Sequence, residues 1–330
     1  MKRVLLRVLC ATVAVVWMAG ASLPGGLAVC RAETVRISIV QLVEHPALDA
    51  VLRGFEDDLR ENVKGVEFTE YNAHGNIGTV NQIAVQMAGD APDMMLAIAT
   101  PPAQACARMY DKVPHLAKTP MLFSAITDPM AAGLVSNYER PGGNISGVSN
   151  MMPMDKHIDM VRRFLPKLKV LGVMYNAGEM NSVSSVRRLR AAAEERGITL
   201  LEAPVSSSAD VYQGALSLVG RADAVYVPAD NTVVAAVEGV VKICEKSGLP
   251  LFTADTDSVA RGAVAALGFD YYEHGRQTGA MARRILAGTP VGEMPVEFQK
   301  NFGFHVNPGA AKRMGLVIPD EVLRSADKLY

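Results

Sequence analysis

Several features that mark common protein classes are scarce in this sequence of 330 residues. It has only four cysteines and six histidines, with no Cys-x-x-Cys pair and no Cys/His cluster, which argues against a zinc site. Basic residues do not outnumber acidic ones, so there is no sign of the basic face that nucleic acid or an anionic membrane surface would need. We therefore expect neither a metal ion nor nucleic acid as a partner.

Motifs for cofactors and for catalysis are absent as well. No Gly-x-Gly-x-x-Gly follows the first expected strand, and there is no P-loop, no Gly-x-Ser-x-Gly elbow and no His-Glu-x-x-His. Asp230 and Asp255 are candidates for an acid–base pair, but each follows a strand and precedes a helix, where a helix N-cap is the alternative. We expect no cofactor and no enzymatic activity.

The first 32 residues have the pattern of an export signal. A basic start, Met1 to Arg3, precedes an uncharged apolar stretch from Val8 to Gly20, and small residues flank a cleavage position near Ala32. The apolar stretch is shorter than the roughly 20 residues that cross a bilayer. Cys30 offers lipidation as an alternative, although Val29 is larger than the residue such sites prefer. We expect a periplasmic or other extracytoplasmic location after cleavage.

Removal of this segment changes the composition of the remaining chain. It takes away four basic and no acidic residues, leaving 29 basic against 34 acidic side chains. The only tryptophan, Trp17, is lost, and Cys106 and Cys244 are the two cysteines that stay. Both lie in expected helices far apart in sequence, and we expect two buried thiols rather than a disulfide.

Short apolar strands alternate with amphipathic helices through most of the chain. The alternation runs from Val35 to about Phe123, restarts near Met154 and continues to Phe269. Among the later elements we expect a helix over 232–247 and a strand-like segment over 296–306. Buried strands separated by helices are typical of parallel sheets covered on both faces. The sequence thus predicts an α/β fold with two similar halves.

The turn from Tyr175 to Ser182 is the stretch that first suggests a ligand. It follows an apolar strand and precedes an amphipathic helix, so backbone N–H groups are free at the helix start. Such a helix start favours a small anion, and we expect this turn to bind the carboxylate of a ligand. The alternative is that Asn181 and Ser182 only cap their own helix.

Polar residues gather where the other expected strands end. Open α/β sheets bind ligands at the carboxyl ends of their strands, so these residues are candidates for ligand contact. Asp230 is suited to the ammonium group of an amino acid whose carboxylate meets a helix start on a facing turn. Aromatic residues near the same ends are candidates to hold an apolar side chain, with core packing as the alternative. They are Phe123, Tyr175, Tyr226 and Tyr271.

Several separated motifs resemble one family. They include Gln41 to Asp49, Arg140 to Val148, the 175–182 turn, Val227 to Thr232, Gly262 to Gly279, and the ending from Val306 to Pro319. Together they resemble the substrate-binding proteins of ABC transporters associated with tryptophan and tyrosine uptake. The likeness runs from about residue 35 to the C-terminus.

The resemblance implies a type I periplasmic-binding fold, with two Rossmann-like lobes containing parallel sheets and joined by three hinge crossovers. The crossovers are expected near 147–152, 269–272 and 301–306. The first lobe would comprise residues 33–150 plus 271–300, and the second 151–270 plus 301–330. Candidate ligand-binding residues are Gln41, Thr100, Thr127, Asp128, Tyr175, Asn176, Glu179, Asn181, Ser182, Asp230, Asn231 and Asp255.

The expected function is that of a monomeric solute-binding protein of an ABC importer. It would capture a small ligand, an aromatic or other amino acid, between two closing lobes and deliver it to an ABC permease with its ATPase. Two alternatives stay open: a ligand-sensing subunit that feeds a membrane signalling protein, and a secreted α/β enzyme that uses Asp230 or Asp255.

Overall fold

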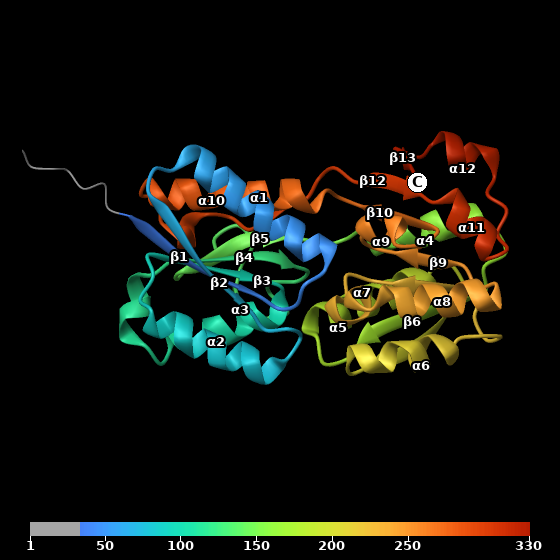
Figure 1. Cartoon of the computed structure of the whole chain (residues 1–330), viewed down its shortest axis with the longest axis horizontal. Helices are drawn as coiled ribbons and strands as arrows, with labels where there is room; N and C mark the ends of the chain where they lie inside the picture. The colour runs from blue at the N-terminus through green and yellow to red at the C-terminus, as the bar shows by residue number, and fades with distance from the viewer. Residues whose placement is uncertain (1–33) are drawn as a thin grey trace, which may run out of the picture. The chain divides into compact units, whose positions relative to one another are not determined.

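Two β-sheets organise residues 34–330, which are the residues that the computed structural model describes (Figure 1). The first sheet has the strand order β11-β5-β4-β3-β1-β2, and the second has the order β13-β12-β10-β9-β8-β6-β7. Strands of the first sheet are β1 Val35–Gln41, β2 Val66–Asn72, β3 Met94–Ile98, β4 Met121–Ile126, β5 Ile145–Ser149 and β11 Glu297–Phe298. Strands of the second sheet are β6 Val170–Asn176, β7 Thr199–Val205, β8 Ala224–Val227, β9 Leu251–Thr253, β10 Ala265–Gly268, β12 Gly303–Val306 and β13 Lys328–Leu329.

The strands form where the sequence has short apolar runs. Every residue of β3, of β4 and of β8 is buried, as expected for central strands covered by helices on both faces. All strand pairs are parallel except β10 with β12, because β12 enters the second sheet from the opposite direction. The predicted pair of parallel α/β halves therefore has one antiparallel exception.

Helices occupy the connections between the strands. The α-helices are α1 Pro46–Asn62, α2 Ile77–Gly89, α3 Thr100–Tyr110, α4 Met154–Phe164, α5 Met180–Glu194, α6 Val211–Leu216, α7 Asn231–Ala235, α8 Val237–Ser247, α9 Asp257–Ala260, α10 Tyr271–Leu286, α11 Pro308–Arg313 and α12 Asp320–Arg324. Short 3₁₀ helices cover Pro114–Lys118, Ser208–Asp210 and Val291–Glu293. The helix expected over 232–247 is divided, because Ala236 leaves helical geometry at φ −120° and ψ 26°.

Helices α1 and α10 lie side by side although more than 200 residues separate them (Figure 1). Their contact depends on glycine, since a Cβ on Gly54 would lie 2.0 Å from the Tyr272 carbonyl oxygen. A Cβ on Gly275 would lie 2.1 Å from the carbonyl oxygen of Val51. This packing returns α10 to the first sheet and brings its first residue, Tyr271, next to the start of α1.

The chain passes between the two sheets three times. The first passage follows β5, the second follows β10, and the third lies between β11 and β12. These passages overlap the three predicted crossovers. The expectation of one strand over 296–306 is wrong: β11 pairs with β5 in the first sheet, and β12 pairs with β10 in the second. The four residues between them make the third passage. The residue boundaries of the two lobes stay a prediction.

The predicted signal segment, its cleavage position and Cys30 lie outside the described residues. From residue 34 onward, the chain contains no helix long and apolar enough to cross a bilayer. Cys106 and Cys244 are buried free thiols, as expected, and burial raises the pKa of each to about 12. Neither thiol is therefore ionised near neutral pH, which makes both unreactive.

Candidate functional site

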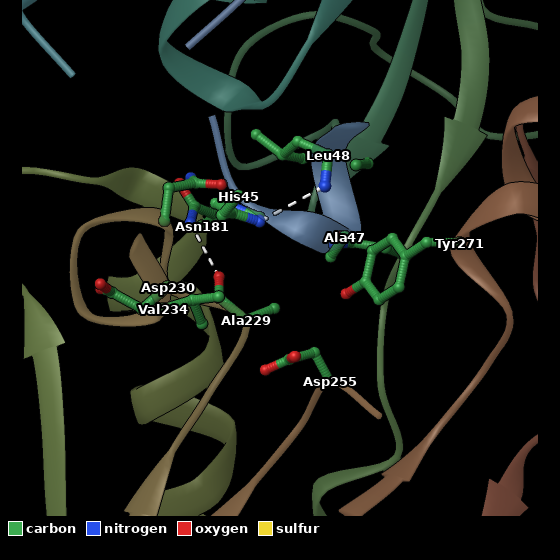
Figure 2. Close-up of a pocket in the computed structure, with 12 residues that line it drawn as sticks. His45, Ala47, Leu48, Asn181, Ala229, Asp230, Val234, Asp255 and Tyr271 are labelled. Carbon is green, nitrogen blue, oxygen red and sulfur yellow. Dashed lines mark hydrogen bonds between the residues drawn. The ribbon is translucent and has the colours of Figure 1, made fainter. Parts of the chain in front are cut away.

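A pocket lies where the carboxyl ends of strands from both sheets meet (Figure 2). This is the edge at which open α/β sheets bind ligands. The free volume inside it is about 20 Å³, which is room for about one water molecule. The pocket is lined by His45, Ala47, Leu48, Ala125, Asn150, Asn181, Ala229, Asp230, Asn231, Val234, Asp255 and Tyr271.

His45 forms part of the first-lobe wall and presents a hydrogen-bond donor. It is the N-cap of α1, and its Nδ1 accepts the backbone N–H of Leu48 at 3.3 Å. Burial lowers the pKa of His45 to about 4, so the ring is neutral and its proton is on Nε2. The side chain is 7% exposed, and no described residue is in hydrogen-bonding geometry with Nε2, although the Asn231 amide lies beside the ring.

Asn181 forms part of the opposite wall and presents an acceptor. Its Nδ2 donates to the carbonyl oxygen of Ala229 at 3.0 Å and to Glu179 Oε2 at 3.2 Å. Because a carbonyl and a carboxylate can only accept, these bonds fix the orientation of the amide. The side chain is 4% exposed, and its Oδ1 has no hydrogen-bond partner among the described residues.

Asp230 brings a buried carboxyl group to the same wall. One oxygen caps α7 by accepting Val233 N–H, and the other accepts the Ser182 hydroxyl at 2.6 Å and the Asn176 N–H. Burial, reinforced by the Glu179 carboxylate, raises the pKa of Asp230 to about 7, although these three hydrogen bonds favour the ionised form. The N-cap interpretation of Asp230 is thus confirmed, and the residue also lines the pocket.

Asp255 and Tyr271 complete the polar lining. Asp255 is 2% exposed and accepts the backbone N–H and the hydroxyl of Ser258, while burial raises its pKa. The Tyr271 ring packs on Phe269 with centroids 4.5 Å apart, which holds it beside the second crossover. Figure 2 shows the Tyr271 hydroxyl turned toward the middle of the pocket. The second-lobe wall therefore carries two buried acids, and Tyr271 supplies a hydroxyl.

The first-lobe wall is mainly backbone and small side chains. Ala125 adopts a positive φ of 57°, which is uncommon for alanine, and its N–H donates to the Nε2 of His274 at 3.0 Å. His274 is fully buried, and burial lowers its pKa to about 3, so it serves as a neutral acceptor. Strained backbone held by a buried partner is common where a ligand is bound. The start of α1, with Ala47 and Leu48, adds the positive end of a long helix.

The turn from Tyr175 to Ser182 has a different role from the one expected. Asn181 and Ser182 do not cap α5, because the N-cap position is Glu179 and both residues are already helical. The Ser182 hydroxyl is fully buried and donates to Asp230, while Asn181 offers an acceptor to the pocket. An acceptor beside buried carboxyl groups is unfavourable for a ligand carboxylate, so this geometry favours a donor group of the ligand at this turn.

The structure brings only some of the predicted site residues together. Asn181, Asp230, Asn231 and Asp255 line the pocket, and Glu179, Ser182 and Asn176 form the hydrogen-bonded layer behind them. Gln41 instead donates to Asp49 at 2.7 Å, and Tyr175 donates to Glu202 at 2.6 Å.

The remaining three predicted residues are also outside the pocket lining. Thr100 is buried with no hydrogen-bond partner for Oγ1 among the described residues. Thr127 donates to Asn150 Oδ1, so it contacts a lining residue. Asp128 bridges the lobes by accepting the Ser184 hydroxyl at 2.9 Å and has Arg187 at 3.9 Å.

Sequence reasoning did not include two polar lining residues, His45 and Asn150, and it considered Tyr271 only as an aromatic residue for an apolar ligand side chain. His45 and Asn150 follow the strands β1 and β5 at the rim used for the other candidates, so the same strand-end rule could have found them. Of the four aromatic residues considered, only Tyr271 lines the pocket, whereas Phe123 and Tyr226 are fully buried in the core.

Comparisons with known proteins agree with this architecture. The family model described as ABC transporter substrate binding protein matches residues 36–330. A tyrosine-binding protein of Clostridioides difficile strain R20291 is 37% identical over 264 residues, covering 79% of this chain and 75% of that protein. The structure of an ABC domain in complex with L-Trp from Streptococcus pneumoniae is 29% identical, with a TM-score of 0.85 over 90% of this chain and 100% of that one. The predicted type I periplasmic-binding fold is confirmed.

A third relative informs the arrangement of the lobes. The ligand-free, open structure of a substrate-binding protein with adhesive properties from Clostridium difficile is 37% identical and covers 89% of this chain and 99% of its own. Its TM-score is only 0.66, below that of the less identical L-Trp complex. The difference agrees with the direct contact of the lobes at Asp128 and with the small pocket between them, both of which indicate a closed arrangement.

Proposed function

Because the chain belongs to the family of ABC transporter substrate-binding proteins, we propose that it captures an aromatic L-amino acid between its two lobes. The ligand class is supported by two relatives, one a tyrosine-binding protein and the other solved with L-Trp. It is supported independently by the chemistry of the pocket. We further propose that Asn181, Asp230, Asn231 and Asp255, with His45 and Tyr271, contact the ligand.

One observation carries the proposal: the closed pocket contains a buried donor and a buried acceptor on opposite walls, and neither is in hydrogen-bonding geometry with a partner among residues 34–330. The donor is Nε2–H of His45 beside the start of α1, and the acceptor is Oδ1 of Asn181 beside Asp230. Buried polar groups are normally paired, so this pair calls for a molecule that accepts at one end and donates at the other. An amino-acid zwitterion does so, with its carboxylate at His45 and its ammonium group at Asn181.

The surrounding charges favour the same orientation. The N-terminus of α1 stabilises an anion at the first-lobe wall, where His45, Ala47 and Leu48 lie. Asp230 and Asp255 place carboxyl groups on the second-lobe wall, where an ammonium group would replace the solvation lost on burial. The reversed orientation would set the ligand carboxylate against two buried acids.

Entry of the ligand requires the lobes to move. A free volume of about 20 Å³ is far too small for an amino acid, so the ligand enters when the lobes separate and holds them slightly farther apart than here. The three crossovers are the segments available for that hinge motion. We propose lobe boundaries at 33–150 plus 271–300 and 151–270 plus 301–330.

We propose that the mature protein acts outside the cytoplasm as a monomer, without chemical conversion of its ligand. In this role it presents the bound amino acid to an ABC permease, and the associated ATPase drives import. The substrate-binding proteins of ABC importers are extracytoplasmic, which agrees with the export signal predicted over residues 1–32.

Calorimetric titration of the mature protein with matched ligands tests the proposal. L-tyrosine and L-tryptophan should bind, whereas tyramine, which lacks the carboxylate, and 3-(4-hydroxyphenyl)propionate, which lacks the amine, should each bind at least about tenfold more weakly. Because the predicted mature chain lacks tryptophan, added L-tryptophan is also its own fluorescent reporter. Binding of glucose or glycerol with no binding of any amino acid would refute the proposed ligand class.

A further inference from the structure

Glu179 lies behind the pocket and has a dense set of hydrogen-bond donors around a buried carboxylate. It is 3% exposed, and it does not belong to the pocket lining. Oε2 accepts the amide nitrogens of Asn181 and Asn231. Oε1 accepts the hydroxyl of Thr232 at 2.8 Å and its backbone N–H at 3.3 Å. One carboxylate thus holds two of the residues that do line the pocket.

These bonds decide which end of each amide faces the ligand. An asparagine side chain presents either two N–H donors or one oxygen acceptor, and exchanging the two ends changes its shape very little. Nδ2 of Asn181 donates to Glu179 and to the Ala229 carbonyl oxygen, which leaves only Oδ1 to face the pocket. Nδ2 of Asn231 donates to Glu179 as well, and the Asn231 amide lies beside the His45 ring.

We propose that Glu179 is a positioning residue that gives the site its selectivity for a protonated amine. It accepts from the nitrogens of Asn181 and Asn231, and because Asn181 is held in this way its amide oxygen faces the ligand's ammonium group. This inference rests on the proposed amino-acid ligand and adds to it the residue that sets the recognition of the amine. A glutamine at position 179 would offer one acceptor and one donor group, so at least one amide would lose its partner or reverse.

The test compares ligand selectivity in Glu179→Gln with that in the wild type. The probes are L-tyrosine and 3-(4-hydroxyphenyl)propionate. The quantity measured is the dissociation constant of 3-(4-hydroxyphenyl)propionate divided by that of L-tyrosine. We expect Glu179→Gln to reduce this ratio about tenfold or more, because L-tyrosine loses an acceptor for its ammonium group while the deaminated acid loses none. A loss shared equally by both ligands would show a general structural role and overturn the inference.

A double-mutant cycle identifies the route of the effect. Asn181→Leu removes the acceptor itself and should reduce the ratio similarly. If Glu179 acts through Asn181, the double variant should be little worse than Asn181→Leu alone. Additive losses would overturn the proposed route. Glu56→Gln is the matched control, because Glu56 is another buried acid that pairs with Arg60 on α1 and does not line the pocket. The ratio of dissociation constants in this variant should equal that of the wild type.

A second variant keeps the inference testable if Glu179→Gln does not fold. Thr232→Val removes the hydroxyl that anchors Oε1 of Glu179, and it should reduce the same ratio by a smaller factor. An unchanged ratio in this folded variant would overturn the inference. Failure of the proposed function is distinguishable from all of these results, because the wild type would then bind neither L-tyrosine nor another amino acid.

Discussion

His45 has two separable tasks, and replacing it with asparagine should remove one of them. The Nδ1 atom caps α1 through Leu48, while the Nε2–H donor faces the pocket. Asparagine is itself a favoured N-cap residue, but its side chain is too short to present a donor where Nε2 lies. His45→Asn should therefore leave the free energy of unfolding within about 0.5 kcal/mol of the wild-type value. His45→Ala should lower it by about 1 kcal/mol, since the cap is lost.

The cost to ligand binding follows from the missing hydrogen bond. A hydrogen bond to a charged group contributes about 1.5–3 kcal/mol, so its loss should increase the dissociation constant for L-tyrosine roughly ten- to hundredfold. The ring is neutral above about pH 5, so the loss should not depend on pH between 6 and 8. Calorimetric titration gives the affinity, and urea unfolding of the ligand-free protein gives the stability.

Tyramine provides the control for His45. It has the ammonium group and the ring of tyrosine but no carboxylate, so His45→Asn should change its affinity by less than about threefold. The reasoning is refuted if His45→Asn binds L-tyrosine as tightly as the wild type. It is also refuted if tyramine and L-tyrosine lose affinity equally, because the histidine would then be shaping the pocket rather than binding the carboxylate.

Three further predictions concern the closed state, pH and packing. Ser184→Ala removes the hydrogen bond to Asp128 between the lobes and should raise the dissociation rate of L-tyrosine about two- to tenfold in stopped-flow measurements, whereas an unchanged rate would show that this contact does not stabilise closure. The affinity for L-tyrosine should increase as pH rises through about 7 and Asp230 loses its proton, while the deaminated acid should show no such increase, and equal profiles would exclude Asp230 as the cause. Since the folded-state pKa of Asp230 lies above its ordinary value of 3.8, the same group makes stability fall as pH rises from about 4 to 7, by at most about 1.4 kcal/mol per pH unit in urea unfolding. Gly54→Ala and Gly275→Ala should each lower the free energy of unfolding by about 1–3 kcal/mol, because the added Cβ meets backbone of the facing helix, and wild-type stability in either would mean that α1 and α10 can separate at little cost.

The fold was predictable because its signals are local. Met94–Ile98 is apolar throughout and Met121–Ile126 is apolar except for Ser124, and runs of this short length are typical of buried parallel strands. The second and third crossovers are less visible in the sequence. Phe298 and Gly303 are close in sequence and belong to different sheets, and nothing in the hydrophobic pattern over 296–306 marks the passage between them.

The site was predictable in place but not in chemistry. The strand-end rule selected Asp230, Asn231 and Asp255, which line the pocket, because position along a parallel strand fixes which edge a residue reaches. Whether an asparagine presents its oxygen or its nitrogen depends on partners from other strands, here Glu179 and the Ala229 carbonyl. Sequence spacing carries no information about such contacts, so the sequence alone does not show that the Asn181 oxygen faces the pocket.

The same contacts indicate why closure would depend on the ligand. When the lobes close on an empty pocket, Nε2–H of His45 and Oδ1 of Asn181 are both buried, and no residue from 34 to 330 is in hydrogen-bonding geometry with either. Each unpaired group costs about 1–3 kcal/mol, and space for about one water molecule leaves little room to satisfy both. In the open protein, both atoms are hydrated. A zwitterion pairs with the two groups at once, so its differential interaction with the closed state is about 2–6 kcal/mol. That is enough to shift the closed population by roughly one to four powers of ten, which allows a transporter to distinguish the loaded protein from the empty one by shape.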